Sequence, residues 1–317
     1  MLKYILQRLF SLIPILLVVS IIVFFLAHLT PGDPVTVLLG DEASEESKAE
    51  LREQLGFDLP LYTQFFVWFK GVLTGDLGDS FFLKMPVLQA FLENLEPTLS
   101  LAILSQIIAI IIALTLGVIA AKKRGTATDQ AVMGLSLFGI SIPSFLVGLL
   151  LILLFSVQLR WLPVAGYRPL SDGIMEHLKY LILPAIALGT MQAALITRMT
   201  RSSMLDVMKS NYIKTAKSKG IHPNKITYKH ALRNAFIPIL TVIGETFGTL
   251  ITGAAVVETV FNIPGIGQLI VNSIERRDFA VIQGTVLLIT VTYVFLNLAI
   301  DLLYGVIDPR VRLNQRN

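Results

Sequence analysis

The chain has 317 residues, of which 54% are hydrophobic and only 15% are charged. This balance is too apolar for one or two soluble domains and indicates an integral membrane protein. The net charge of +4 is small, and the basic stretch of the chain lacks interleaved aromatic residues, which argues against a nucleic-acid partner. The absence of cysteine excludes a disulfide scaffold, thiolate metal sites and thiol chemistry.

The first predicted element is a transmembrane helix over residues 9–27, which is just long enough to cross the hydrocarbon core. With the N-terminus it makes a first segment, residues 1–28. Residues 29–98 form an insertion with twelve acidic and four basic residues, and we expect it to lie outside the cytoplasm. The acids follow neither a calcium-loop nor a His/carboxylate spacing, so they indicate a solvated acidic face and no metal site.

Two helices are expected inside this insertion. One covers residues 44–55, with Ser44 as its N-cap and acidic residues in its positive first turn. The other covers residues 62–73 and is rich in aromatic residues on one side.

Residues 99–317 are predicted to hold five further spans, so that the chain is an all-α, polytopic membrane protein with six transmembrane helices. The five spans are expected at about 99–121, 131–157, 178–196, 236–257 and 280–306. The third contains Ser141 and Pro143. Because proline removes a backbone hydrogen bond, we expect a helix break there, which could line a pathway or serve packing alone.

A basic loop over residues 198–238 separates the fourth and fifth predicted spans. Nine cations and one acid lie between Arg198 and Arg233, so the loop should be cytoplasmic, and the distribution of the other cations places both termini on the same side. Within it we expect a short helix from Asn211, a capping residue, to Gly220, a left-handed terminator. A second helix is expected to begin at Asn224. A helix of about eight residues needs a surface to lie against, which we take to be another protein.

Chemical sites are scarce in this sequence. No phosphate-binding loop occurs, so the chain should not bind ATP in that manner, and no paired histidines, zinc motif or nucleophile predicts a catalytic or metal site. An intramembrane enzyme therefore has no motif to support it. Ionisable groups inside spans are costly, so Glu245, in a predicted helix with Thr241 and Thr249, is a candidate; it could line a pathway or hydrogen-bond to a neighbouring helix.

Lys214-Thr215-Ala216, followed by three residues and Gly220, resembles the loop signature Glu-Ala-Ala-x-x-x-Gly of ABC importer permeases, in the form found in the dipeptide/oligopeptide/nickel permease family. Two features depart from the general signature: Lys214 stands where many permeases have Glu, and the loop's proline is delayed to Pro238. The other matching stretches are Pro31-Gly-Asp-Pro34, Gly75-Asp-Leu-Gly78, Gly139-Ile-Ser-Ile-Pro143, Trp161-Leu-Pro163, Arg201-Ser-Ser-Met-Leu-Asp206, Lys229-His-Ala-Leu-Arg-Asn-Ala-Phe-Ile-Pro238, Val257-Glu-Thr-Val-Phe261, Pro264-Gly-Ile-Gly267, Arg277-Asp278, Asp301-Leu-Leu-Tyr304 and Asp308-Pro-Arg310.

The resemblance implies a type I ABC importer permease fold in a bacterial or archaeal cell membrane, with residues 99–317 as the permease core. Its implied partners are a sister permease, two cytoplasmic ATPase subunits that bind ATP and magnesium, and an extracytoplasmic solute-binding protein that delivers short peptides. The chain itself would carry no cofactor. The residues implied to contact the ATPase are Lys214, Thr215, Ala216, Gly220, Ile221 and His222, and those of a possible translocation path are Ser141, Pro143, Thr241, Glu245 and Thr249.

Within the same family, nickel, a metal chelate or glutathione is an alternative substrate. Outside it, the alternative is a proton-coupled secondary transporter, which would show two related halves within one chain. We see no such internal repeat in this sequence.

Overall fold

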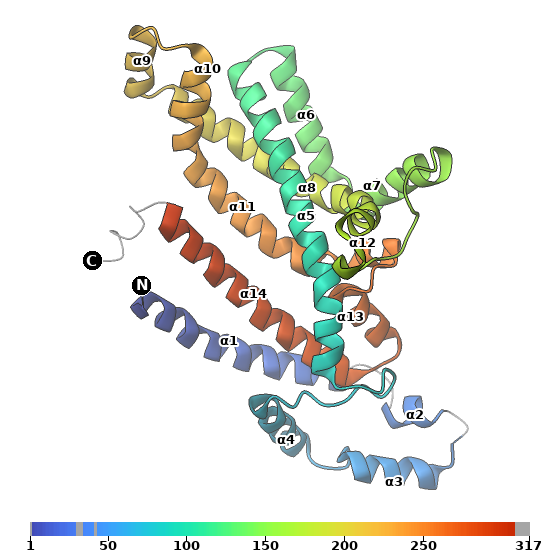
Figure 1. The fold of residues 1–317 in the computed structure, drawn as a ribbon. Helices are drawn as coiled ribbons and strands as arrows, with labels where there is room; N and C mark the ends of the chain where they lie inside the picture. The colour runs from blue at the N-terminus through green and yellow to red at the C-terminus, as the bar shows by residue number, and fades with distance from the viewer. Residues whose placement is uncertain (1, 30–33, 41–42, 308–317) are drawn as a thin grey trace. The chain divides into compact units, whose positions relative to one another are not determined.

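The structure is a computed structural model, and it describes residues 2–29, 34–40 and 43–307. Apart from a single bridge between Asp79 and Pro86, all regular structure in these ranges is helical (Figure 1). The chain divides into two compact units, Met1–Glu96 with Pro264–Leu298, and Pro97–Ile263 with Ala299–Asn317. Parts of two sequence motifs, at residues 31–33 and 308–310, lie outside the described residues.

Four helices are long and apolar enough to cross a membrane, and the described residues give up to six spans when each of two bent helix pairs is counted as one. The four are α5 (Val87–Lys122), α8 (Ile174–Met208), the run Pro223–Gly253, and α14 (Phe279–Ile307), whose apolar window is Phe279–Ile300. The predicted first span falls in α1 (Leu2–Leu29). The all-helical membrane fold is therefore confirmed.

The first unit begins with α1 and continues through α2 (Pro34–Leu39), α3 (Glu45–Leu55) and α4 (Leu61–Thr74). Both helices expected in the insertion are confirmed. The Ser44 hydroxyl accepts a hydrogen bond from the Ser47 N–H at 3.2 Å, as an N-cap should, and left-handed Gly56 ends α3. The same unit holds α13 (Ile266–Glu275) and the start of α14, where Asp278 accepts a 2.5 Å hydrogen bond from the Ser80 hydroxyl.

The third predicted span is broken, as its proline indicated. Helix α6 (Ala127–Ser141) and the segment Ser144–Gln158, which comprises α7 (Ser144–Leu151) and the π-helix η1 (Ile152–Gln158), meet at an angle of 102°. The break falls at Ile142 and Pro143, because Pro143 cannot donate to the preceding turn.

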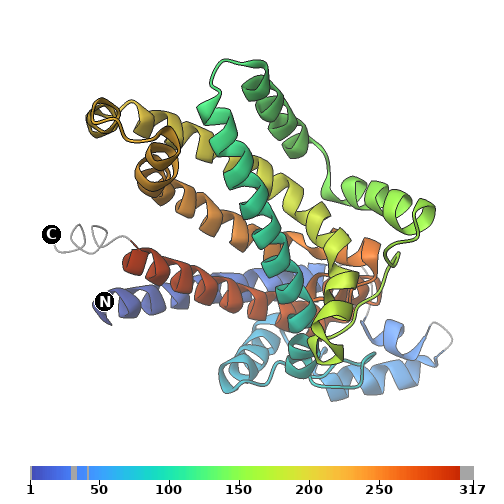
Figure 2. The same cartoon turned by 45° about the horizontal axis from the view of Figure 1, so that its top comes forward.

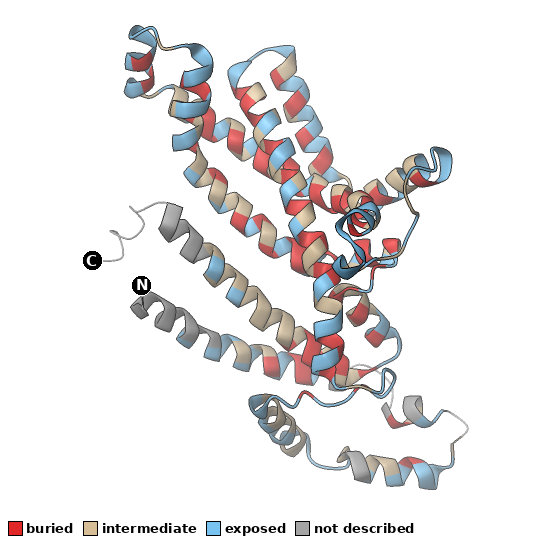
Figure 3. Cartoon of the chain, in the orientation of Figure 1, coloured by how far each residue is buried: buried red, intermediate tan, exposed pale blue. Residues whose placement is uncertain are grey.

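The basic loop is much shorter than its predicted range of 198–238. Helix α8 continues through Arg198 to Met208, and the next long helix begins at Pro223 and runs through α10 (Pro223–Lys225), the π-helix η3 (Ile226–Leu232) and α11 (Arg233–Gly253) (Figure 2). Hydropathy locates only the part of a helix that lies in hydrocarbon. Here the polar ends stay helical because they still bury apolar side chains, among them Met204 and Ile226. Figure 3 shows buried residues along the helices up to this end of the second unit.

The other ends of the predicted spans differ for related reasons. Helix α5 begins at Val87, whereas the predicted span began at residue 99. The prediction started too late because Glu93 and Glu96 lower the hydropathy of a stretch that is nonetheless helical. The fifth span ends at Gly253 instead of residue 257. A separate short helix, α12 (Ala255–Phe261), then follows.

Small residues bring α5 and α8 into close approach at two points of the second unit. A Cβ placed on Gly117 would lie 2.6 Å from the Thr200 Cβ, and a Cβ on Gly189 would lie 2.8 Å from the Ser105 carbonyl oxygen. A side chain fits at neither position, so the α5 backbone at Gly117 packs against the Thr200 side chain, and the α8 backbone at Gly189 packs against the backbone at Ser105.

Candidate functional site

The short helix expected in the basic loop is α9 (Asn211–Ser218), which lies with α10 at one end of the second unit (Figure 1). Its N-cap residue is Ser210, so the prediction that Asn211 is the cap was wrong by one position, and the Ser210 side chain makes no capping hydrogen bond. The far end is as predicted: Gly220 has φ +70°, in the left-handed region that favours glycine. The Ile221 N–H then donates to the Ala216 carbonyl at 3.3 Å, which closes the helix end.

One side of α9 is fixed to the helix bundle. Ile213 and Ala216 are buried in a cluster that includes Val118 of α5, Met204 of α8 and Ala231 of η3, and Ile221 packs against the same cluster. The core therefore holds the position of this short helix, which could not be stable alone.

The other side of α9 is open. Lys214 and Thr215 are exposed, as are Gly220 and His222 beyond the helix. The residues that the sequence grouped together thus divide into two sets. Lys214, Thr215, Gly220 and His222 are available to a partner, whereas Ala216 and Ile221 support the helix from beneath.

The second helix of the loop starts differently from the prediction. His222, not Asn224, is its N-cap residue: His222 Nδ1 accepts the Asn224 N–H at 3.3 Å, and Pro223 occupies the first helical position. The Asn224 side chain instead accepts a hydrogen bond from Lys122 Nζ at 3.2 Å. This contact ties the end of α5 to the start of α10.

An ion pair that the sequence did not predict joins α6 to α8 near the same end. Asp129 is only 3% exposed, and both of its carboxylate oxygens accept from Arg201, at 2.5 and 2.7 Å. The Gly125 N–H also donates to Asp129 at 2.9 Å. A charge-assisted pair with two parallel hydrogen bonds is among the strongest polar contacts in proteins. It fixes the start of α6 against α8.

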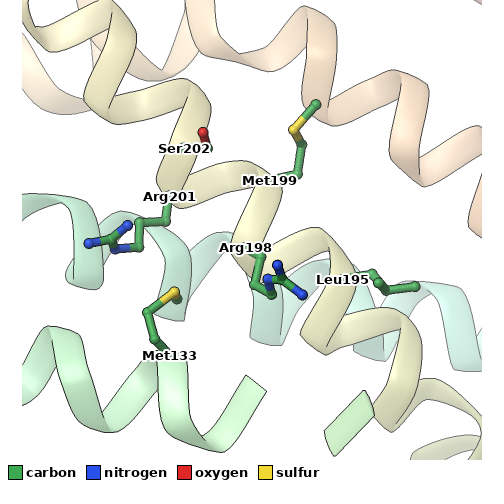
Figure 4. Close-up of a pocket in the computed structure, with 6 residues that line it drawn as sticks. All are labelled: Met133, Leu195, Arg198, Met199, Arg201 and Ser202. Atoms are coloured by element: carbon green, nitrogen blue, oxygen red, sulfur yellow. The ribbon is translucent and has the colours of Figure 1, made fainter. Parts of the chain in front are cut away.

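An open hollow of about 550 Å³ lies along this part of α8 (Figure 4). Arg198 and Arg201 lie on its wall with Met133 of α6 and with Leu195 and Met199 of α8. Figure 4 shows Arg201 and Met133 on the side of α8 that faces α6, and Met199 and Ser202 pointing away from it.

The candidate path residues of α11 lie on one exposed stripe. Thr241, Glu245 and Thr249 recur every fourth position and are all exposed in this chain, while Gly244 and Gly248 on the opposite face are buried. Glu245 therefore points away from the helices that pack on α11.

Two glutamines support α11 from behind the stripe. Gln106 of α5 donates to the Ile243 carbonyl at 3.2 Å and to Thr246 at 3.3 Å, and Gln192 of α8 donates to Thr249 at 3.4 Å. These contacts orient α11, and with it the direction in which Glu245 points.

Ser141 and Pro143 lie at the bend of the third span, apart in sequence from the α11 stripe. The Ser141 hydroxyl donates to the Leu137 carbonyl at 2.9 Å, and Pro143 is the N-cap residue of α7. Ser141 is exposed, and its hydroxyl returns to its own helix instead of bonding to another one.

Glu258 of α12 is a second functional candidate that sequence reasoning missed, although it lies within the Val257–Phe261 motif. It is fully buried, and the Thr98 hydroxyl of α5 donates to it at 2.6 Å. Full burial and the hydrogen bond from Thr98 join α12 to α5 through this carboxylate. Among the described residues no group of three or more His, Cys, Asp or Glu could hold a metal ion.

The apolar helices and the two bent pairs define a multi-pass, α-helical membrane protein. The family "Binding-protein-dependent transport system inner membrane component" matches residues 113–313, and its N-terminal counterpart, "Binding-prot-dependent transport system membrane comp, N-term", matches residues 1–102. The chain belongs to this family and is an inner-membrane permease subunit of an ABC importer.

Relatives of full length agree with this assignment. The chain is 45% identical to the "Probable peptide ABC transporter permease protein y4tP" of Sinorhizobium fredii, over 98% of this chain and 99% of the relative. It is 43% identical to the "Glutathione transport system permease protein GsiC" of Salmonella choleraesuis, over 98% and 99% of the two chains.

The fold has a solved counterpart. A structure titled "Inward facing conformations of the MetNI methionine ABC transporter" matches 70% of this chain and 97% of its own, with a TM-score of 0.58 and 19% identity. This likeness concerns the fold alone, and it confirms the type I importer permease architecture that the sequence predicted.

Proposed function

We propose that this chain is one of two sister permeases that together translocate short peptides, with energy from two cytoplasmic ATPase subunits. The observation that carries the proposal is the geometry of α9, whose buried side is fixed to α5, α8 and η3 while Lys214 and Thr215 face outward. A short helix held in this way can transmit a displacement from a bound partner to α5, to α8 and to the helical run Pro223–Gly253. An extracytoplasmic solute-binding protein would supply the substrate.

The choice of peptides rests on the relatives. Of the two named above, one is named for peptides and the other for glutathione, which is itself a tripeptide. Glutathione is therefore the second candidate substrate.

Uptake into proteoliposomes that contain the complete complex and its binding protein tests the substrate. We expect ATP-dependent accumulation of labelled di-, tri- or oligopeptides, and mass spectrometry of the co-purified binding protein should find the same class of molecule. Accumulation of a nickel chelate without any peptide would contradict the proposal.

We also propose that both termini and α9 are cytoplasmic and that residues 29–98 lie outside, because of the distribution of cations. The cysteine-free chain allows single-cysteine labelling in sealed vesicles. Ala49→Cys on α3 and Lys219→Cys beyond α9 should react with a membrane-impermeant maleimide from opposite sides. Labelling of both from one side would disprove the orientation.

Glu245, with Thr241 and Thr249, is proposed to line the translocation path, where the bend at Ser141 and Pro143 would also lie. Glu245→Gln keeps the shape of the side chain and removes its charge, so we expect a lower uptake rate with normal assembly. Thr252→Val, on the same exposed side of α11, is the control for a change that involves no charge. Unchanged uptake by Glu245→Gln would leave that carboxylate outside the path.

A further inference from the structure

Helix α4 is apolar on the side that it turns away from the rest of the first unit. Tyr62, Phe66 and Leu73 are 69%, 66% and 72% exposed, and none of the residues of the helix is buried. Its only charged residue is Lys70. An exposed apolar surface of this kind marks contact with a protein or a membrane. It is unexpected in a segment whose acidity indicates a solvated insertion.

The inner side of α4 is joined to α1, the helix that contains the predicted first span and the apolar stretch Ile13–Phe25. The ring of Phe24 lies 5.3 Å from that of Phe65 in an edge-to-face contact and 5.7 Å from the Trp68 ring, measured between centroids. Phe24 itself is only 2% exposed. The position of Phe24 along α1 therefore sets the depth at which α4 lies.

That depth follows from helix geometry. The 28 residues of α1 are about 42 Å long at 1.5 Å per residue, whereas the hydrocarbon core is about 30 Å thick. Phe24 lies five residues before Leu29, or roughly 8 Å from the end of α1. With the hydrocarbon core over the predicted span 9–27, Phe24 lies three residues, or roughly 5 Å, inside its outer edge. Helix α4, packed against Phe24, falls at the same level.

We propose that α4 lies in the membrane interface at the Leu29 end of α1, with Tyr62, Phe66 and Leu73 in contact with lipid. Tyr and Trp rings favour this level, and the Lys70 ammonium can reach a lipid phosphate while its stem stays in apolar surroundings. Helix α1 also has exposed apolar side chains near this end, Ile22 and Phe25.

Its neighbour α3 shows the contrast. Glu45 and Glu46 occupy its first turn, and most of its described residues are exposed and polar, as expected for a helix in water. The insertion thus has one helix suited to lipid and one suited to water, and α4 attaches the segment to the bilayer surface.

Nitroxide labels on single cysteines test the placement in the full complex, assembled with cysteine-free partner subunits in phosphatidylcholine/phosphatidylglycerol vesicles. Labels at Phe66→Cys and Leu73→Cys should collide with oxygen in preference to aqueous nickel-EDDA, at a depth of roughly 5–10 Å below the headgroups. Ala49→Cys on α3 should show the reverse preference, and Ile22→Cys on α1 supplies the lipid-facing reference. Stimulated ATP hydrolysis by each labelled complex verifies its assembly.

Two outcomes would overturn the proposal. If the labels at positions 66 and 73 collide with nickel-EDDA as often as the label at position 49, α4 is solvated. If they are protected from both reagents, a protein partner covers the helix. Positions 66 and 73 lie on the same exposed side of α4. If one label disturbs the structure around it, the other position still reports whether this side of the helix contacts lipid.

Discussion

Gly220→Val is expected to abolish the stimulation of ATP hydrolysis by the loaded binding protein, and uptake with it, while the chain still inserts and assembles. Gly220 is left-handed, and a Cβ at this position would meet nothing within 4 Å, so valine introduces a purely conformational cost of about 1–2 kcal/mol. The backbone avoids that cost by changing its course. The hydrogen bond from the Ile221 N–H to Ala216 is then lost, and Ile221 and the His222 cap are displaced.

A matched substitution separates this effect from strain alone. Gly75 is also left-handed at a helix end, and a Cβ added there would again meet nothing within 4 Å, but it follows α4 and not α9. Gly75→Val should therefore carry a similar cost and leave stimulation intact. Lys219→Ala removes one exposed charge and should change the coupling by less than about 1 kcal/mol. Normal stimulation and uptake in Gly220→Val would refute the assignment of α9 as the ATPase-coupling helix.

Arg201→Met is expected to lower the stability of the permease by about 3–5 kcal/mol, because it leaves the buried Asp129 carboxylate without its cation. The measurement is the midpoint of thermal unfolding in detergent. The double variant Asp129→Asn/Arg201→Met removes both charges and should recover a large part of the loss. Arg198→Met, one turn away on α8 and exposed, serves as the matched control and should change the midpoint little.

A double variant no more stable than Arg201→Met would contradict this account, since the loss would then come from the packing of the arginine stem and not from the unpaired carboxylate. The double-mutant cycle measures that difference directly.

Local sequence signals predicted local structure well. Ser44 and its acidic neighbours marked the start of α3, Pro143 marked the break in the third span, and Gly220 marked the end of the short helix. Each of these features depends on the preference of one residue for a backbone conformation, which is the same in any fold.

The misplaced helix ends have one common cause. Apolarity measures how much of a helix lies in hydrocarbon, so the sequence places the polar end of α5 in the insertion and that of α8 in the basic loop, although both ends are helical. His222 holds the capping position instead of Asn224, with its ring nitrogen accepting the Asn224 N–H, which residue preference alone does not indicate.

Contacts between distant residues could not be predicted. Asp129 and Arg201 are 72 positions apart, and Thr98 and Glu258 are 160 apart. The sequence around Asp129 or Glu258 does not indicate which residue pairs with it, because the pairing depends on how α5, α6, α8 and α12 pack together. The split of the candidate coupling residues into exposed and buried sets likewise appears only when the bundle beneath α9 is known.

The close approach of α5 and α8 at Gly117 and Gly189 has a mechanical consequence. Two helices in contact at both points resist sliding or tilting against each other, because either movement would cause a clash. We therefore expect α5 and α8 to move together as a rigid body over this region. Helix α9 packs against Val118 of α5 and Met204 of α8, at one end of this helix pair. A small displacement of α9 would then reach the second contact, at Gly189 and Ser105, instead of being absorbed by the nearest side chains.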